Sequence, residues 1–257
     1  MRRSPLVFKV ATASLHERRE RVKDRIRATV DADAERQKFI ALYPHKSLTR
    51  PSPPLSPGSI RNDVFNSQLD KLISIGRSMK AFSLSAPKAH WSATVVVMRT
   101  TVDSEFEAWV NPAVPGYDDR KSVAPMYGMW ENCCSLGKVA AWVVRPQSVH
   151  CSGLDEYGNP KAELLQGFRA RLMMHELDHL QGKSILQQSL GPDFVVAQHS
   201  LEQRDLWPDD FPSIEAKMTP EFHFFDYVTN CVVPIPGFDY DSLARDMFNE
   251  NARIQSR

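Results

Sequence analysis

Residues 168–182 read FRARLMMHELDHLQG. Apolar residues recur through this stretch at helical spacing, and Gly182 is placed to end a helix in the left-handed conformation. We therefore predict a helix over residues 168–181. Histidines share its inner face with apolar side chains, and a buried polar group is costly unless it has a partner. The helix is therefore expected to carry a functional site.

The two histidines of this helix are spaced for metal binding. His175 and His179 are four residues apart, so both imidazoles lie on one face and can hold a single metal ion. Glu176 lies beside them. A carboxylate in that place can take a proton from water and return it to a leaving amine, as metal-assisted hydrolysis requires.

The third ligand decides which class of enzyme this is, because two histidines leave a tetrahedral site incomplete. Ile185 stands where the long H-E-x-x-H-x-x-G-x-x-H protease signature has its last histidine, which excludes that family. Glu202 follows His179 at a spacing compatible with a thermolysin-like protease and stays an alternative. Upstream, Cys133 offers a thiolate, and one cysteine with two histidines leaves one position for water.

Short strands are expected before this helix. Four segments are β-branched or alternating and are separated by turn residues, and a fifth leads into the helix. An earlier helix begins at Asn62 or Asp63 and has apolar residues at helical spacing. The order of one helix, several strands and a second helix predicts an α+β fold with antiparallel sheets around the metal-binding helix. The expected strands are residues 94–98, 106–111, 139–145, 149–155 and 162–165.

Three parts are predicted along the chain. Residues 1–38 form an N-terminal extension, in which 1–16 are basic and suit an organelle presequence, and a charged helix follows from residue 17 to 40. Residues 39–190 form the catalytic domain. Residues 191–257 are rich in aromatics and prolines and are expected to form an irregular extension that ends in a short helix near 242–251.

Composition excludes several classes of protein. The net charge of the 257 residues is +1, which argues against nucleic acid or an anionic membrane as the main partner. No apolar run approaches the roughly 20 residues of a membrane span. The chain has 4 cysteines, two of them adjacent, which is too few for a disulfide scaffold and favours a reducing compartment.

Three motifs in order resemble those of peptide deformylases, which carry G-x-G-L-[AS]-A-x-Q, E-G-C-x-S and H-E-x-D-H. Here they read AFSLSAPK at 81–88, ENCCS at 131–135 and HELDH at 175–179. The resemblance covers about residues 39–190. It implies removal of the formyl group from the N-terminal formylmethionine of nascent polypeptides, beside the ribosome in bacteria or organelles.

The resemblance also implies roles for residues of the site. Cys133, His175 and His179 hold one divalent metal ion, with iron(II) favoured and zinc, nickel or cobalt able to occupy the site. Glu176 is the general base. The backbone N–H of Cys134 helps to bind the carbonyl oxygen of the formyl group.

Five further residues are candidates for the surroundings of the site. Two of them belong to the first motif and are expected to line the substrate pocket. The other three are candidates to support the metal ligands, as an acid and arginine pair at family positions and as a carboxylate that orients a ligand histidine. The alternative is that they are surface ions and an exposed helix carboxylate. They are Ser83 and Leu84, then Glu131, Arg145 and Asp178.

Three departures from the family pattern bear on activity. Lys88 replaces the glutamine that donates a hydrogen bond to the developing oxyanion, while Ser83 and Asn132 replace glycines. Beside a divalent ion, Lys88 is expected to become neutral, to turn away, or to pair with Glu176, and alternatively it supplies positive charge to the oxyanion. A deformylase-like binding protein, whose C-terminal extension engages a partner, is therefore the second hypothesis.

The basic N-terminus favours the mitochondrion, with the cytoplasm as the alternative location. The expected partner is a formylated nascent peptide near the ribosome, without direct contact to nucleic acid or membrane.

Overall fold

The computed structural model describes residues 17, 19–24, 39–100, 104–117, 126–219, 224–226 and 231–233. The proposed presequence and the helix expected near 242–251 lie outside these residues. Of the charged segment 17–40, the described residues 17 and 19–24 are helical and mostly exposed. No helix among the described residues is long and apolar enough to cross a membrane.

The first helix of the domain, α2, spans Asp63–Ser78. The side chain of Asn62 caps it by accepting a hydrogen bond from the backbone N–H of Phe65 at 2.7 Å, which confirms the predicted start. One face of α2 is apolar and packs into a core cluster with strands of the first sheet, through Phe65, Leu69, Leu72 and Ile75. Short 3-10 turns at Lys46–Leu48 and Pro57–Ser59 lie in the proline-rich segment before it.

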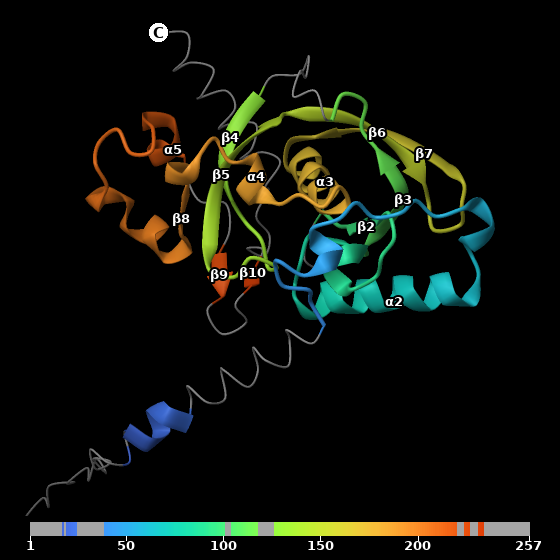
Figure 1. Cartoon of the computed structure of the whole chain (residues 1–257), viewed down its shortest axis with the longest axis horizontal. Helices are drawn as coiled ribbons and strands as arrows, with labels where there is room; N and C mark the ends of the chain where they lie inside the picture. The colour runs from blue at the N-terminus through green and yellow to red at the C-terminus, as the bar shows by residue number, and fades with distance from the viewer. Residues whose placement is uncertain are drawn as a thin grey trace, which may run out of the picture.

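A five-stranded antiparallel sheet, in the order β1-β2-β3-β6-β7, lies between α2 and α3, the helix that carries the predicted metal ligands (Figure 1). Strand β2 has the sequence VVVM and is buried on both faces. Val95 and Val97 pack toward α2, whereas Val96 and Met98 pack toward α3. The strands are β1 Ser83–Ser85, β2 Val95–Met98, β3 Glu107–Ala113, β6 Ser148–Leu154 and β7 Pro160–Gln166.

A second sheet, in the order β4-β5-β8, covers another side of α3 (Figure 1). Its strands are β4 Met126–Asn132, β5 Val139–Pro146 and β8 Val195–Ala197. Strand β4 was not among the expected strands. Strand β8 lies beyond the boundary predicted at residue 190, and it pairs with β5. The three-part division of the chain stays a prediction.

The outer face of this second sheet is covered by the segment that follows β8. A cluster of tryptophans and small residues fills the interface. The indole Nε1 of Trp130 donates to the carbonyl oxygen of Ala216 at 2.8 Å, so the cover is also held by hydrogen bonds. The segment consists of η5 Gln198–Leu206 and α5 Ile214–Met218, preceded by α4 Ile185–Gln188 and η4 Pro192–Phe194.

Helix α3, Gly167–Leu180, carries the HELDH motif and is buried along most of its length. It ends at Leu180, and the predicted terminating glycine, Gly182, follows with a φ of +69°. A Cβ atom there would also lie 2.7 Å from the backbone of Arg50, so glycine is required both by conformation and by space. The α+β class, with antiparallel sheets packed around this helix, is confirmed.

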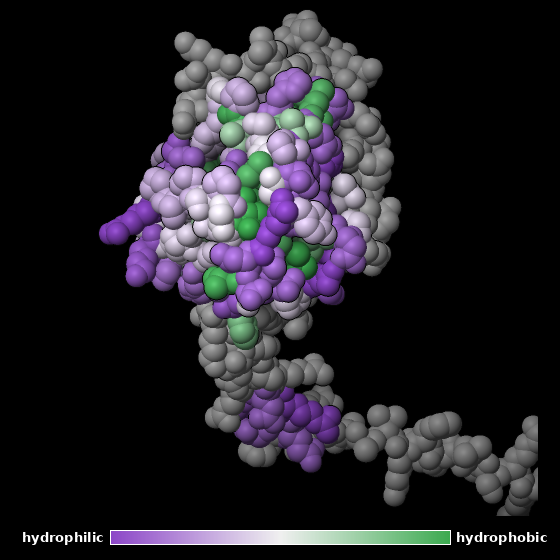
Figure 2. Space-filling view, turned by 90° about the vertical axis from the view of Figure 1, so that its right-hand side faces the viewer, coloured by the Kyte–Doolittle hydropathy of each residue, from purple (hydrophilic) through white to green (hydrophobic). Residues whose placement is uncertain are grey.

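The remaining described strands are β9 Phe224–Asp226 and β10 Cys231–Val233, which form a two-stranded sheet. The face of the molecule beside the β6–β7 turn and the start of α2 is mainly hydrophilic, with a few small hydrophobic groups (Figure 2). Gly158 of that turn lies against Ile60 and Arg61, which precede α2.

Candidate metal centre

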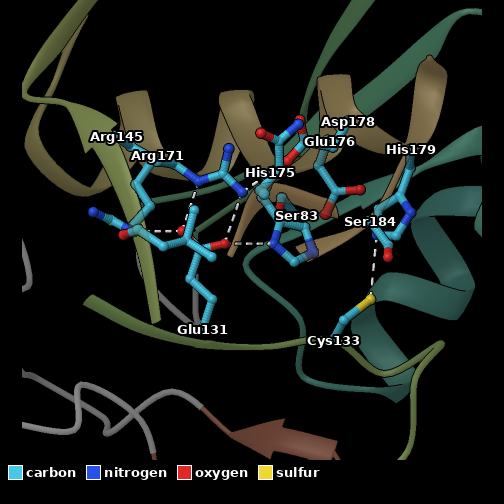
Figure 3. A network of polar contacts seen from close by, with 12 residues as sticks. Ser83, Glu131, Cys133, Arg145, Arg171, His175, Glu176, Asp178, His179 and Ser184 are labelled. Atoms are coloured by element: carbon cyan, nitrogen blue, oxygen red, sulfur yellow. Dashed lines mark hydrogen bonds and ion pairs between the residues drawn. The ribbon is translucent and has the colours of Figure 1, made fainter. Parts of the chain in front are cut away.

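Three predicted ligands converge between the end of β4 and the buried face of α3. Cys133 directly follows β4, while His175 and His179 project from α3. One ligand atom from each lies within 4.8 Å of the others. The Sγ atom of Cys133 is 3.2 Å from Nε2 of His179, and all three side chains are buried (Figure 3).

The chemistry of this cluster fits a divalent metal ion. Nδ1 of His175 contacts a carboxylate oxygen of Glu131 at 3.1 Å, which leaves Nε2 free to face the other ligands. Burial holds the pKa of His179 well below its ordinary value, so this imidazole is neutral, the form that binds metals. A sulfur and two imidazole nitrogens leave one position open in a tetrahedral site.

Glu176 lies beside the ligands and is held by two side chains from the first motif. Ser83 Oγ donates to Glu176 Oε1 at 2.8 Å, and Lys88 Nζ donates to the same oxygen at 3.0 Å. Both charged groups are buried, Lys88 at 3% exposure and Glu176 at 1%. Of the outcomes expected for Lys88, the structure therefore has the pairing with Glu176.

Electrostatics keep this pair ionised in spite of its burial. Desolvation by itself favours the neutral forms, but the Lys88 ammonium holds the pKa of Glu176 below its ordinary value. In turn, burial lowers the pKa of Lys88, but the negative charges of the Cys134 thiolate and the Glu176 carboxylate outweigh it and raise that pKa above its ordinary value. Glu176 is thus a carboxylate, as a proton acceptor must be, but one that is already engaged by a cation.

A buried network of charged side chains contacts the ligand cluster through Glu131. Arg145 donates to both oxygens of Glu131, at 2.6 and 2.8 Å, and its Nη2 also donates to Asp178 at 2.8 Å. Arg171 donates to the same carboxylate of Glu131 at 2.5 Å. Burial opposes the charge of Glu131, yet Arg145 and the other donors hold its pKa well below the ordinary value. Glu131, Arg145 and Asp178 therefore meet as an internal network (Figure 3).

The cavity beside the cluster has an apolar wall and a polar wall. The apolar side chains come from the end of α2, from the residues before β1 and from α3, and the polar groups are those of the site itself. Cys134 also lines the cavity, and the role expected for its backbone N–H stays a prediction. The apolar wall consists of Met79, Ala81, Phe82, Phe168 and Leu172.

Two expectations do not hold in the structure. Leu84 is fully buried in the core with α2 and does not line the cavity. It alternates with Ser83 along β1, so the hydroxyl of Ser83 faces Glu176 and the side chain of Leu84 faces the other way. Glu202 is exposed in η5 and is not part of the ligand cluster.

Three members of the network were missed by the sequence reasoning. Tyr117 OH donates to Asp178 Oδ1 at 2.5 Å, and Gln188 Nε2 donates to the same atom at 2.8 Å. The sequence around Tyr117 and Gln188 contains no pattern that predicts this contact. Arg171 has such a pattern, because it precedes His175 by one helical turn and so lies on the face that the motif predicts to be buried.

Comparison with known proteins agrees with this site. The family model described as Polypeptide deformylase matches residues 37–192. The chain belongs to the peptide deformylase family. The match includes the ligand cluster, Glu176 and the supporting network, and members of this family are metal-dependent hydrolases.

Individual relatives support the same assignment. A peptide deformylase of Rhodopirellula baltica is 30% identical over 146 residues, which cover 54% of this chain and 67% of the relative. Peptide deformylase 1B, chloroplastic/mitochondrial, of Arabidopsis thaliana is 28% identical over 188 residues, covering 70% and 64%. A peptide deformylase from Synechococcus elongatus, solved in complex with actinonin, superposes with a TM-score of 0.53 at 22% identity over 60% of this chain and 79% of that one, which supports the fold.

Proposed function

We propose that this peptide deformylase hydrolyses the formyl group from N-terminal formylmethionine with a divalent metal held by Cys133, His175 and His179. The observation that carries the proposal is the buried cluster of these three ligands beside the carboxylate of Glu176. A divalent ion held by these three side chains would supply Lewis-acid chemistry, which polarises a carbonyl group and lowers the pKa of water. Iron(II) is favoured, and zinc, nickel or cobalt are the alternatives.

The protein's own groups supply the proton transfers and the orientation. Glu176 accepts a proton from the attacking water and returns it to the nitrogen of the leaving amine. The backbone N–H of Cys134 is the candidate donor to the oxygen of the formyl group. Lys88 pairs with Glu176, and its role as a cationic donor to that oxygen is the alternative. The apolar cavity wall, which includes Phe82 and Phe168, accepts the methionine side chain.

The proposed location is an organelle that starts translation with formylmethionine, with the mitochondrion favoured over the cytoplasm. The basic N-terminal residues 1–16 support it, as does the similarity to the Arabidopsis relative, which is named as chloroplastic/mitochondrial. The proposed partner is a formylated nascent chain close to the ribosome.

Release of formate from formyl-Met-Ala-Ser tests the proposed activity. The full chain is purified anaerobically, loaded with iron(II) or cobalt(II), and assayed after its metal content has been measured. Stoichiometric metal with steady formate release is the expected result. Full metal loading without formate release would contradict the proposal.

That second outcome would favour a deformylase-like binding protein. The observation behind this alternative is the buried ion pair between Lys88 and Glu176, which occupies the proposed base. Binding of formyl-Met-Ala-Ser to the metal-loaded protein without turnover is the result that separates it from the enzyme.

Ligand assignment is tested by replacing Cys133 and Glu202 in parallel. Cys133→Ser is expected to lose most of its bound metal, because a hydroxyl is a poor substitute for a thiolate ligand. Glu202→Gln is expected to keep the wild-type metal content, because Glu202 is exposed outside the cluster. Metal analysis after gel filtration measures both, and full metal content in Cys133→Ser would refute the assignment.

Lys88→Gln is expected to raise kcat/KM for formyl-Met-Ala-Ser by about a hundredfold or more, the scale of a restored oxyanion donor. The change releases Glu176 from its cation and places a neutral donor at the position that the family uses. Wild type and variant are compared at equal metal content from pH 6 to 9. A slower variant with intact metal would show instead that Lys88 serves the oxyanion as a cationic donor.

A further inference from the structure

Arg171 connects the elements that supply the two kinds of metal ligand. It stands on α3 one turn before His175 and is only 3% exposed. Its Nη2 donates to the carbonyl oxygen of Tyr127 in β4 at 2.8 Å, and its Nη1 donates to that of Val143 in β5 at 3.2 Å. The guanidinium also lies over the ring of Tyr127, 4.4 Å from its centroid. Arg171 thus ties α3 to both main strands of the second sheet.

The same guanidinium meets the carboxylate that supports a ligand. Arg171 Nη1 donates to Glu131 Oε1 at 2.5 Å, while Nδ1 of His175 contacts Glu131 Oε2 at 3.1 Å. Arg171 and His175, one turn apart on α3, therefore contact the two carboxylate oxygens of Glu131 in β4 (Figure 3). Glu131 precedes Cys133 by only two residues. Its contact with His175 therefore helps to fix the position of the histidine relative to the cysteine.

We propose that Arg171 is a positioning residue that sets the geometry of the metal ligands. By fixing α3 against β4 and by holding Glu131, it determines how Nε2 of His175 faces the sulfur of Cys133. This inference rests on the ligand set given under the proposed function.

The contacts on the other side of His175 show why a second anchor matters. Arg145 links Glu131 to Asp178, which lies one turn after His175 on α3. Arg171 makes the corresponding link one turn before it. With both anchors in place Glu131 and His175 are held from both sides, whereas Arg145 alone holds them from one side.

Arginine is needed at this position because several acceptors lie in different directions. Its planar fork reaches the carboxylate of Glu131 and two backbone carbonyls at once, and it stacks on Tyr127. Lysine keeps the charge but offers a single nitrogen. Arg171→Lys is therefore expected to keep the positive charge at this position but to lose the hydrogen bonds that fix α3 and Glu131.

Cobalt(II) titration of the metal-free protein tests the proposal, with visible absorption as the readout of ligand geometry. Arg171→Leu and Arg171→Lys are expected to bind cobalt(II) about 10- to 100-fold more weakly than wild type, the usual cost of losing a supporting contact. Their absorption bands at saturating cobalt(II) are expected to shift. A role in folding alone would not alter the spectrum of folded, saturated protein.

Arg169→Leu is the matched control. Arg169 lies on the same helix and also holds two carboxylates, those of Glu107 and Glu163, but away from the cluster. It is expected to keep the cobalt(II) affinity and spectrum of the wild type, so that loss of ion pairs on α3 does not by itself explain the result.

The outcomes separate this inference from the ligand assignment. Cobalt(II) binding by wild type and its loss in Cys133→Ser decide the ligands. Wild-type affinity and spectrum in a folded Arg171→Leu would overturn the positioning role while leaving the ligands intact. If Arg171→Leu does not fold, Arg171→Lys decides alone, and an unchanged spectrum in it overturns the proposal.

Discussion

Replacing Glu176 with glutamine is expected to lower kcat for formyl-Met-Ala-Ser by about 10²- to 10⁴-fold at unchanged metal content. Glutamine has nearly the same shape as glutamate and still accepts the hydrogen bond of Ser83, but it cannot take a proton from water. The three proposed ligands are other side chains, so the ion is expected to stay bound. Initial rates of formate release, with metal measured in the same samples, give the comparison.

The ion pair with Lys88 requires a second variant, because Glu176→Gln leaves a buried ammonium without its carboxylate. The double variant Glu176→Gln with Lys88→Gln removes that unpaired charge. It is expected to remain as inactive as Glu176→Gln, since the base is still missing. Recovery of activity in the double variant would show that the unpaired lysine, and not loss of the base, caused the defect.

Replacing Glu131 with leucine is expected to reduce the free energy of unfolding by about 3–5 kcal/mol, the cost of leaving buried charges without a partner. Glu131 is 4% exposed and accepts hydrogen bonds from Arg145 and Arg171. Asp178 can compensate Arg145 only in part. Urea unfolding of both proteins in metal-free form measures the difference, so that lost metal affinity does not contribute to it.

Glu105→Gln provides the comparison at the surface. Glu105 pairs with Arg77, and the two side chains are 84% and 53% exposed, so the change is expected to cost less than about 1 kcal/mol. A similarly small loss in Glu131→Leu would contradict the account of the buried network.

The pH dependence of stability gives the same network a second test. Because the folded pKa of Glu131 lies well below the unfolded value of 4.5, its contribution is present above about pH 4.5 and is lost as the pH falls. Wild type is therefore expected to lose stability more steeply below pH 4.5 than Glu131→Leu.

Local patterns were sufficient for the elements whose signals lie within themselves. The cap at Asn62, the helix over 168–181 and the glycine at 182 each depend on neighbouring residues, and the structure has all three. Strand β4 was not predicted, because its sequence, MYGMWEN, mixes glycine and charge with apolar residues. It becomes a strand through pairing with β5, and the indole of Trp142 fills the space above Gly128.

The amino-acid sequence by itself determined the family, the α+β class and the four residues at the centre of the site, because three ordered motifs place a cysteine, two histidines and a glutamate at fixed spacing. Tertiary structure decided what surrounds them. Strand alternation turned Leu84 into the core, folding brought Lys88 within 3.0 Å of Glu176, and packing of α3 on two strands placed Arg171 against Glu131. The contacts of Lys88 and Arg171 join residues 88 and 40 positions apart, and the direction of Leu84 depends on which face of the strand carries it. The physical reason is that only the packed chain creates such contacts.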